Sequence, residues 1–347
     1  MSVAETSDPQ VDLVGIETKV RDYLMQLPPD FLGVERCEPV EVLLMTPGAY
    51  NLNYHVKVGG KRFIFRVNIE QQSGLTEQIA YEYHVMKFME GYDIAPRAYH
   101  MDDSKQFFQF DVMIEEYLEG PHVSLTKEDV PSVAELLNKI HSLPCQGLPL
   151  ITWNDPLADT LRLVEKDLEE YEAKITPDAQ IRQLARECLE MMKHKLDQHR
   201  RKYAPDGMNH TDDAIDNFIK TAKGLRMIDW EKPRYDDCSY DVCCFLARPA
   251  QLWCAPETLP EEGAEIFLQE YIALSGKEEQ LFREKVRIRQ PLVSLHWVMW
   301  GANKLCDLRD RLTFTELQTV HKTKVMRWER MTTPAVLEAV YREFETS

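Results

Sequence analysis

Short apolar or alternating segments fill the first third of the chain. Three of them, VEVLLM (40–45), NYHVKV (53–58) and KRFIFRVNI (61–69), have the period-two or continuous apolar pattern of β-strands. The Gly59-Gly60 pair between the second and third segments predicts a tight hairpin turn. A further strand pair ends in QFFQFDVMIEEYL (106–118). We therefore expect a small antiparallel sheet in this part of the chain.

One segment in this sheet region has a helical period instead. In LTEQIAYEYHVMKFME (75–90), the side chains of a single face recur at helical spacing, and that face comprises Ile79, Glu82, Tyr83, Met86 and Met89. A leading helix is expected before the sheet, over residues 12 to about 27. The sheet itself is predicted to carry the 75–90 segment as its only helix.

The pattern becomes helical after Gly120. The segment VPSVAELLNKIHSL (130–143) has an apolar face, and residues 155–175 and 178–203 form two charged amphipathic stretches that predict a helical hairpin. Three or four more helices are expected over residues 260–347. The fold class is therefore α+β, with a boundary near residues 118–121 that divides the chain into lobes 1–118 and 119–347.

Composition and charge exclude several classes of protein. The formal charge of −17 argues against a nucleic-acid partner, because phosphate backbones need concentrated Lys and Arg. That charge is compatible with a cationic small substrate. No run of apolar residues is long enough to span a membrane, and the first residues lack a secretory signal. Eight Cys at irregular spacings, without a CxxC pair, favour reduced thiols and a cytoplasmic location.

The segment NHTDDAIDNFI (209–219) gathers a His, three Asp and an Asn between apolar stretches. His210, Asp212 and Asn217 have the spacing of a kinase catalytic loop, in which an Asp orients and deprotonates the incoming hydroxyl. Asn217 and the Asp229 of MIDWEKP (227–233) offer oxygen ligands for Mg²⁺, and a hairpin between them would bring both together. The alternative interpretation of the loop is a turn capped by its own Asp and Asn side chains.

In these motifs and their order, the chain resembles the aminoglycoside phosphotransferase and choline kinase superfamily, which are small-molecule kinases. The resemblance rests on NHTDDAIDNFI, on MIDWEKPRYDDCSYDVCCFL (227–246), on SVAELLNKIHSLP (132–144) and on VMIEEYLEG (112–120). It implies a protein-kinase-like fold, with a small nucleotide-binding lobe of sheet and one helix and a larger helical lobe that carries catalysis and substrate. It also implies ATP, or GTP, and Mg²⁺ as cofactors.

The resemblance assigns roles in the second lobe. Asp212 is expected to be the catalytic base, and Asn217 and Asp229 are expected to bind the metal, with Glu231 as a further candidate ligand. If the segment after LRMI is extended, Asp229 and Glu231 point the same way and both approach the metal. His210 is expected to brace the loop.

Asp241, four residues before Phe245, resembles the aspartate with which the family holds its catalytic loop through backbone hydrogen bonds. The alternative role for Asp241 is that of a helix N-cap.

In the first lobe the resemblance points to the nucleotide. Arg66 stands where related kinases carry the cation that contacts the α- and β-phosphates, with Glu82 as its expected partner and Glu77 as the competing one. A surface position on the strand is the alternative for Arg66.

The turn of residues 47–53, with Gly48 and Asn51, is expected to cover the phosphates. The adenine is expected to bond backbone atoms of residues 115–117, so Glu116 and Tyr117 are nucleotide-binding candidates.

The acceptor is less well defined. Thr211 stands where the family often has Gly, and Ala214 and Ile215 where it often has Pro. Trp297 and Trp300, one helical turn apart, are either core residues or an aromatic wall for a quaternary ammonium group. A hydroxylated amine, an aminoglycoside and a sugar remain possible substrates, and the oligomeric state is open. The competing function is a pseudokinase that serves as a nucleotide-binding scaffold.

Overall fold

The computed structural model describes residues 13–28, 31–33, 40–45, 51–71, 75–311 and 322–347. The chain divides into two compact units, residues 1–119 and 120–347, which we call the sheet lobe and the helical lobe. The mixed α+β class and the small antiparallel sheet are as the sequence predicts. The division falls inside the predicted joint at residues 118–121.

The sheet lobe is built on a five-stranded antiparallel sheet in the order β1-β2-β3-β5-β4. Its strands are β1 (Glu41–Leu44), β2 (Asn51–Val58), β3 (Lys61–Asn68), β4 (Ala98–Asp102) and β5 (Asp111–Glu116). The predicted Gly59-Gly60 turn is confirmed, with φ of 53° and 74°, in the left-handed region that glycine occupies at low cost.

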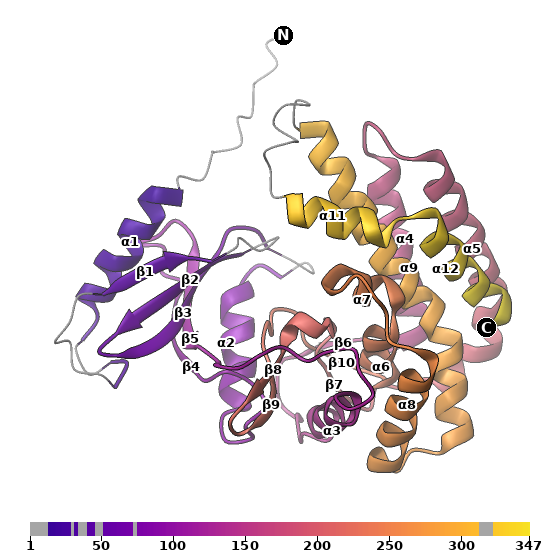
Figure 1. Cartoon of the computed structure of the whole chain (residues 1–347), viewed down its shortest axis with the longest axis horizontal. Coiled ribbons are helices and arrows are strands. Elements are labelled where there is room, and N and C mark those ends of the chain that lie inside the picture. Colours follow the sequence, from indigo (N-terminus) through magenta and orange to yellow (C-terminus); the bar gives the residue numbers. More distant parts are fainter. Residues whose placement is uncertain (1–12, 29–30, 34–39, 46–50, 72–74, 312–321) are drawn as a thin grey trace, which may run out of the picture. The chain divides into compact units, whose positions relative to one another are not determined.

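Two helices cover opposite faces of this sheet (Figure 1). The leading helix α1 (Leu13–Gln26) shares one apolar core with Phe63, Phe65 and Val67 of β3. Because side chains alternate along a strand, Arg66 lies on the other face, where α2 (Gln78–Phe88) packs. The prediction that the sheet carries a single helix is therefore wrong, since the leading helix also packs on it.

The helical lobe contains the predicted hairpin and long helices around one core. The apolar face of α3 (Val130–His141) is buried as predicted, and it comprises Val133, Leu136, Leu137 and Ile140. The helices of this lobe that the structure describes are α3 (Val130–His141), α4 (Pro156–Glu172), α5 (Ala179–His199), α6 (Ser239–Leu246), α7 (Arg248–Cys254), α8 (Glu261–Ser275), α9 (Glu279–Arg311), α11 (Lys322–Met331) and α12 (Pro334–Thr346).

Helix α9 is the longest of these, with 33 residues, and its apolar side chains share a core with α4, α5 and α12. Figure 1 shows α9 passing beside these helices through the body of the lobe. A helix held along most of its length by packed neighbours is a rigid support for the shorter elements attached to it.

Two short sheets complete the helical lobe. One has the order β6-β10-β7, from Ile151–Thr152, Arg234–Asp236 and Gly207–Asn209, and the sequence analysis missed it. The other is the predicted hairpin of β8 (Phe218–Thr221) and β9 (Gly224–Met227). Gly120 lies against this hairpin so closely that a Cβ atom would stand 2.0 Å from the Lys220 carbonyl oxygen, and only glycine fits there.

Strand β10 is fixed to α9 by a buried ion pair. The guanidinium of Arg289 donates to both carboxylate oxygens of Asp236, at 3.0 and 2.8 Å, and neither side chain is exposed. Arg234 donates to the same carboxylate at 3.0 Å. Because β10 pairs with β7, this cluster positions the strand from which the candidate catalytic loop begins.

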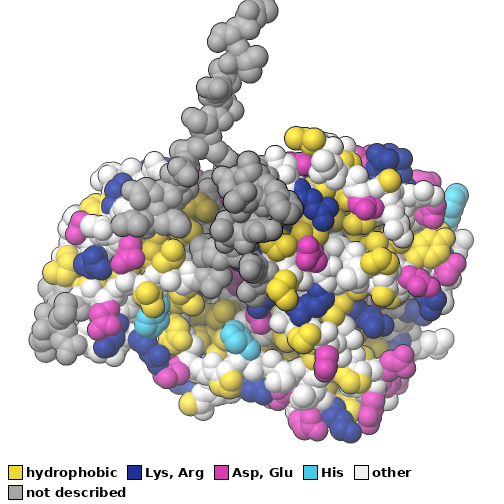
Figure 2. Space-filling model, turned by 45° about the horizontal axis from the view of Figure 1, so that its top comes forward, with side chains coloured by type: hydrophobic (Ala, Val, Ile, Leu, Met, Phe, Trp, Pro, Cys, Tyr) yellow, Lys and Arg dark blue, Asp and Glu magenta, His cyan; other side chains and the backbone are white. Residues whose placement is uncertain are grey.

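Acidic and basic side chains are interspersed on the molecular face drawn in Figure 2. None of the described helices is both long and apolar enough to cross a membrane.

Candidate active site

The loop from His210 to Asn217 leads from β7 into β8 and ends in a 3-10 turn, Ile215–Asn217. Its first backbone amides are held by Asp241, near the start of α6. The carboxylate of Asp241 accepts hydrogen bonds from the N–H groups of His210 at 2.7 Å and Thr211 at 2.9 Å. This contact is the one that the resemblance implies for Asp241.

Asp241 is fully buried and has a further partner. The ring of His141, at the end of α3, lies 3.1 Å from its carboxylate and 2.7 Å from the hydroxyl of Tyr271. Burial alone would raise the pKa of Asp241, but the hydrogen bonds from His141 and the loop outweigh it and lower the pKa. The carboxylate is therefore ionised, which strengthens its bonds to the loop amides.

Thr211 has a left-handed backbone, with φ of 74°. A β-branched residue in this region is a true outlier that costs on the order of 1–3 kcal/mol. Two contacts hold it there, because its N–H donates to Asp241 and its hydroxyl donates to the Lys232 carbonyl oxygen at 3.0 Å. The departure from the family's glycine at this position thus adds a tie between the loop and the segment after Asp229.

His210 is buried and supports the loop from within. Its Nδ1 accepts from the Asp212 N–H at 3.3 Å, and its Nε2 lies 3.0 Å from the Ile228 carbonyl oxygen. The ring also meets the edge of Trp230 at 4.6 Å. Burial lowers the pKa of His210, so the neutral ring donates through Nε2, which agrees with a bracing role.

Asp212 follows with a partly exposed carboxylate, 18% accessible. The ammonium of Lys232 lies 3.6 Å from its Oδ2 atom. The sequence analysis missed Lys232, because twenty residues separate the two and only the fold of the β8–β9 hairpin returns the chain to the loop. A cation beside the candidate base can stabilise negative charge that develops in the transition state of a group transfer.

Asn217 and Asp229 are joined by that same hairpin, as predicted. The Ile228 N–H donates to the Asn217 carbonyl oxygen at 2.9 Å, where β8 and β9 meet. The Asn217 side chain donates its NH₂ group to the Asp212 carbonyl oxygen at 2.9 Å, so its amide oxygen is the atom directed away from that bond. An amide oxygen and a carboxylate are ligands that suit Mg²⁺.

The extended geometry expected for Asp229 and Glu231 is wrong. Asp229 has φ of 69°, in the left-handed region, so the chain turns there and the alternation of a strand does not apply. Asp229 is half-buried, whereas Glu231 is only 6% exposed. Over the described residues, no three His, Cys, Asp or Glu side chains converge as a metal cluster, so a metal here would need Asp229 together with the amide oxygen of Asn217 and oxygen atoms of a ligand.

Asp213, beside the candidate base, is 1% exposed, and neither carboxylate oxygen has a hydrogen-bond partner. Burial, together with the nearby Asp241 carboxylate, raises its pKa well above the usual range. The surroundings of Asp213 therefore favour its uncharged form.

In the sheet lobe, Arg66 is 3% exposed, so the surface alternative is wrong. Its guanidinium lies 2.9 Å from the Glu82 carboxylate of α2, and 3.6 Å from that of Glu115 on β5. The expected partner is thus Glu82 rather than Glu77. The sequence analysis missed Glu115, which faces Arg66 because β3 and β5 are neighbours.

The remaining nucleotide-binding candidates of the sheet lobe differ in burial and in hydrogen bonding. Asn51 opens β2, is buried, and accepts a hydrogen bond from Asn68 at 2.9 Å. Gly48 lies outside the described residues. The Glu116 N–H donates to the Arg97 carbonyl oxygen at 2.8 Å, so it is not free for an adenine. Tyr117, one residue beyond β5, contacts His55 at 4.9 Å and the Arg62 guanidinium at 4.7 Å.

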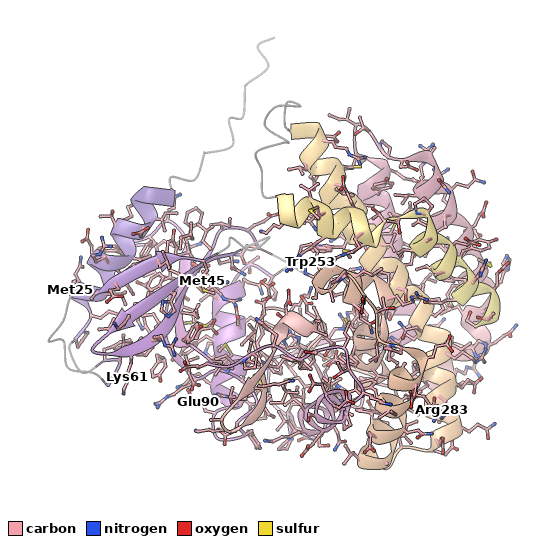
Figure 3. The ribbon with its side chains drawn as sticks, in the orientation of Figure 1. Met25, Met45, Lys61, Glu90, Trp253 and Arg283 are labelled. Atoms are coloured by element: carbon pink, nitrogen blue, oxygen red, sulfur yellow. The ribbon has the colours of Figure 1, made fainter. Side chains whose placement is uncertain are left out.

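The two predicted tryptophans separate in the structure. Trp297 is 7% exposed and belongs to the core, whereas Trp300 is half-buried. Trp300 meets Trp253 of α7 edge-on at 5.0 Å, and Trp253 stacks on Trp328 of α11 at 5.9 Å. Figure 3 labels Trp253 where α7 lies beside α11. The aromatic cluster is therefore real, but its members come from three helices.

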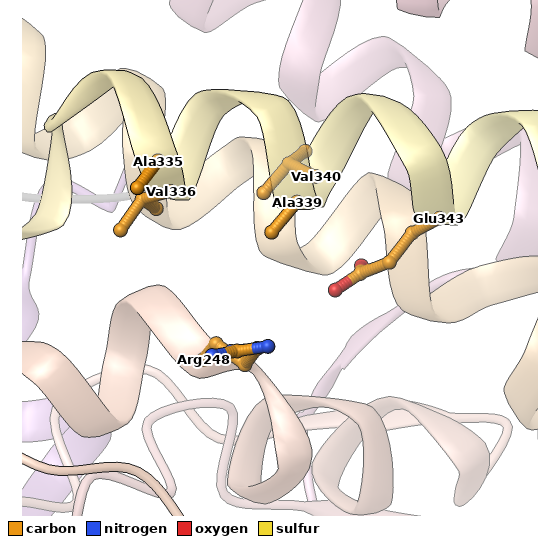
Figure 4. Close-up of a pocket in the computed structure, with 6 residues that line it drawn as sticks. All are labelled: Arg248, Ala335, Val336, Ala339, Val340 and Glu343. Carbon is orange, nitrogen blue, oxygen red and sulfur yellow. The ribbon is translucent and has the colours of Figure 1, made fainter.

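A small pocket of about 80 Å³ lies elsewhere in the helical lobe, between α7 and α12. In Figure 4, Arg248 of α7 faces Glu343 of α12 across it, with Ala339 and Val340 on the apolar side. None of the predicted site residues lines it. Burial raises the pKa of Glu343 to about 7, against the opposing effects of Ser294 and Arg248.

Comparison with known proteins identifies the family. The sequence profile of the phosphotransferase enzyme family matches residues 42–281 of the 347 residues, and the chain belongs to this family. The curated proteins compared with the chain include no match.

Solved structures share the whole fold. The choline kinase LicA from Streptococcus pneumoniae aligns with a TM-score of 0.61 and 19% identity, over 94% of this chain and 99% of that chain. An ethanolamine kinase from Plasmodium vivax aligns with a TM-score of 0.60 and 15% identity, over 94% and 90%. A thermostable mutant of the aminoglycoside phosphotransferase APH(4)-Ia aligns with a TM-score of 0.59 and 12% identity, over 94% of this chain and 98% of that chain. The protein-kinase-like two-lobe fold expected from the sequence is thereby confirmed.

The tie between Thr211 and Lys232 makes a first testable prediction. Thr211→Val keeps the branched shape but leaves the Lys232 carbonyl without its donor, and we expect a loss of roughly 1–3 kcal/mol in unfolding free energy. Thr211→Ser retains the hydroxyl and is expected to stay within about 0.5 kcal/mol of the parent. Urea denaturation of the three proteins measures both values. Equal stability of the Val variant and the parent would show that the hydroxyl holds nothing.

Glu343 makes a second prediction, on pH. Its folded pKa is raised, so its contribution to stability is complete below the unfolded pKa and is lost as pH rises through the folded pKa, a window from about 4.5 to 7. Glu343→Gln should abolish this loss, worth on the order of 1–3 kcal/mol. The measurement is the pH dependence of unfolding free energy, with the exposed Glu345→Gln as the control. Parallel pH profiles for the parent and Glu343→Gln would contradict the assignment.

Proposed function

We propose that this chain is an ATP- and Mg²⁺-dependent kinase that transfers the γ-phosphate to a hydroxyl group of a small molecule, with Asp212 as the base. The observation that carries the proposal is the loop itself. Asp212 projects a partly exposed carboxylate from a backbone that Asp241 and His210 hold rigidly. Membership of the phosphotransferase enzyme family, and the choline, ethanolamine and aminoglycoside kinases among the similar folds, support the reaction type.

Asp212 and Lys232 would act on different parts of the reaction, Asp212 on the proton of the acceptor and Lys232 on the charge of the phosphate. The Asp212 carboxylate would orient the acceptor hydroxyl and take its proton at an oxygen atom as the bond to phosphorus forms. Lys232, 3.6 Å from Oδ2, would approach the negative charge of the transferring group. The Thr211 hydroxyl donates to the backbone carbonyl of Lys232, so the backbone of Lys232 is held against the loop that carries Asp212.

Asn217 and Asp229 fit the role of metal ligands. The side-chain NH₂ of Asn217 is engaged with the loop, which leaves its amide oxygen for a cation, and Asp229 follows the strand that pairs with its own. Bound there, Mg²⁺ would neutralise negative charge on the phosphates of the nucleotide. We assign Glu231 a lesser role, because its side chain is buried beyond the turn at Asp229.

In the sheet lobe, Arg66 would hold the α- and β-phosphates. Its guanidinium is already oriented by the carboxylates of Glu82 and Glu115, so little side-chain entropy remains to be lost on binding. Asn51 and Gly48 would belong to the phosphate-covering turn, and the backbone at Tyr117 would meet the adenine. The structure of LicA in complex with AMP supports an adenine nucleotide over GTP. A cytoplasmic location remains the prediction.

The test is transfer of labelled γ-phosphate from ATP to a panel of hydroxylated small molecules, with Mg²⁺ and with a chelator. We expect Mg²⁺-dependent transfer to at least one acceptor. Asp212→Asn should retain ATP binding and lose about 10²–10⁴-fold in rate, because Asn keeps the size but removes the proton acceptor. Asp197→Asn, at a side chain 92% exposed, is the matched control.

Asp212→Asn transferring phosphate within about threefold of the parent would show that Asp212 is not the base. ATP binding without transfer to any acceptor would favour the competing function, a pseudokinase scaffold.

Arg66→Lys makes a separate prediction for the nucleotide. Lysine keeps one charge for Glu82 but loses the planar fork, so we expect roughly tenfold weaker ATP binding, measured by calorimetry. Arg66→Ala is a poorer probe, since it would leave two buried carboxylates unpaired at a cost of about 3–5 kcal/mol. The control is Arg21→Lys, at a 43% exposed side chain of α1 on the other face of the sheet. Unchanged affinity in Arg66→Lys would place Arg66 outside the phosphate site.

A further inference from the structure

We propose that the pocket between α7 and α12 is a binding site for a small zwitterion, a molecule of about the size of glycine with an ammonium group at one end and a carboxylate at the other. None of the predicted site residues lines this pocket, so such a site is separate from the candidate active site. Two side chains of opposite charge, Arg248 and Glu343, face one another across it (Figure 4).

One face of α12 forms the apolar wall of the pocket. The lining positions on this helix recur at helical spacing, and they are Ala335, Val336, Ala339, Val340 and Glu343. An alanine side chain ends at Cβ, so the two alanines leave a space that a longer side chain would fill. The volume of about 80 Å³ is that of roughly three water molecules at about 30 Å³ each. Because covalently bonded atoms lie closer together than neighbouring waters do, a compact molecule of about five non-hydrogen atoms fits this space.

The two charged side chains of the pocket do not pair with one another or with the rest of the described chain. Arg248, at the start of α7, is exposed, and it has neither an ion pair nor a hydrogen bond among the described residues. Glu343 is half-buried and likewise has no ion pair there, and its Oε2 atom is shielded from solvent without a hydrogen-bond partner. Burial raises the pKa of Glu343 to about 7, and Ser294 and Arg248 oppose this effect. The cation therefore acts on the carboxylate from across the pocket, without contact.

A zwitterion would satisfy both charges at once. Its ammonium group would donate hydrogen bonds to the Glu343 carboxylate, whose charge is disfavoured by burial. Its carboxylate would accept from the Arg248 guanidinium, at the exposed side of the pocket. The short carbon stem between the two groups would lie against the apolar face of α12.

Ligands with a single charge fit the pocket less well. A simple amine would pair with Glu343 but would bring a second cation toward Arg248, and a simple carboxylate would pair with Arg248 but approach the Glu343 carboxylate. An apolar molecule would contact the wall and leave the carboxylate without a donor. The opposed charges therefore favour a ligand that carries both signs.

The experiment compares three molecules that have the same number of non-hydrogen atoms and differ in charge. Glycine carries both groups, propionate has a methyl group in place of the ammonium, and isobutylamine has an isopropyl group in place of the carboxylate. Each is titrated at constant ionic strength into the full chain with labelled Ala and Val methyl groups, at about pH 8, where Glu343 is mostly ionised. The NMR shifts of the Val336, Ala339 and Val340 methyl groups report occupancy of the pocket. We expect a saturable shift with glycine, at about tenfold higher affinity than with either isostere.

Three variants assign the parts of the ligand to the parts of the pocket. Glu343→Gln and Arg248→Gln should each reduce the glycine affinity about fivefold to tenfold. The affinity for propionate should not fall in Glu343→Gln, nor that for isobutylamine in Arg248→Gln, because each keeps its own partner. Ala339→Leu places a longer side chain in the pocket and should abolish binding of all three molecules. Glu345→Gln and Arg342→Gln, at exposed positions of the same helix, are the controls and should change none of the affinities.

The three ligands test the site on the parent chain, so the result does not depend on the folding of any variant. The zwitterion site is overturned if glycine gives no saturable shift of the pocket methyl groups, or if either isostere binds as tightly as glycine. It is also overturned if both charge variants keep the parent's preference for glycine, or if Ala339→Leu binds glycine as the parent does.

Discussion

The geometry of the candidate site depends on one buried carboxylate, that of Asp241. It accepts hydrogen bonds from the first two backbone N–H groups of the catalytic loop and contacts the His141 ring. It therefore joins α6, α3 and the loop at a single point. A carboxylate buried without such donors would be protonated and would lose its hold on the amides. The ionised state of Asp241 and the path of the loop therefore depend on one another.

That hold explains why the loop tolerates an unfavourable residue. Thr211 occupies a left-handed conformation that a β-branched residue avoids, and the bonds from its amide to Asp241 and from its hydroxyl to Lys232 offset the cost. In return, the strained residue connects the base-bearing loop to the segment that follows Asp229. Strain that is held from both sides restricts motion, and restricted motion is what a base and a metal ligand need to keep their separation.

Much of this arrangement was open to prediction, because it follows local patterns. The alternation in NYHVKV and KRFIFRVNI, the paired glycines between them and the spacing of His210, Asp212 and Asn217 each report on a few adjacent residues. Contacts between residues that are far apart in the sequence were missed. They are Lys232 beside Asp212, Glu115 beside Arg66, and the packing of α1 on the sheet. The left-handed Asp229 was missed for another reason, since an apolar run before it favours an extended chain and only the tertiary structure imposes the turn.

The net charge of the chain likewise fails to predict the local charges beside the catalytic loop. A net charge of −17 suggests an electropositive partner, yet charge acts locally, because screening in water removes most of the interaction beyond about 10 Å. On the face drawn in Figure 2, acidic and basic side chains are interspersed rather than gathered by sign. Beside the catalytic loop, α11 instead places the Arg327 guanidinium 2.9 Å from the Asp216 carboxylate and 5.3 Å from the centre of the Trp253 ring. The charge beside the loop therefore follows from the packing of one helix against α7 and α9, which the net charge of the chain does not report.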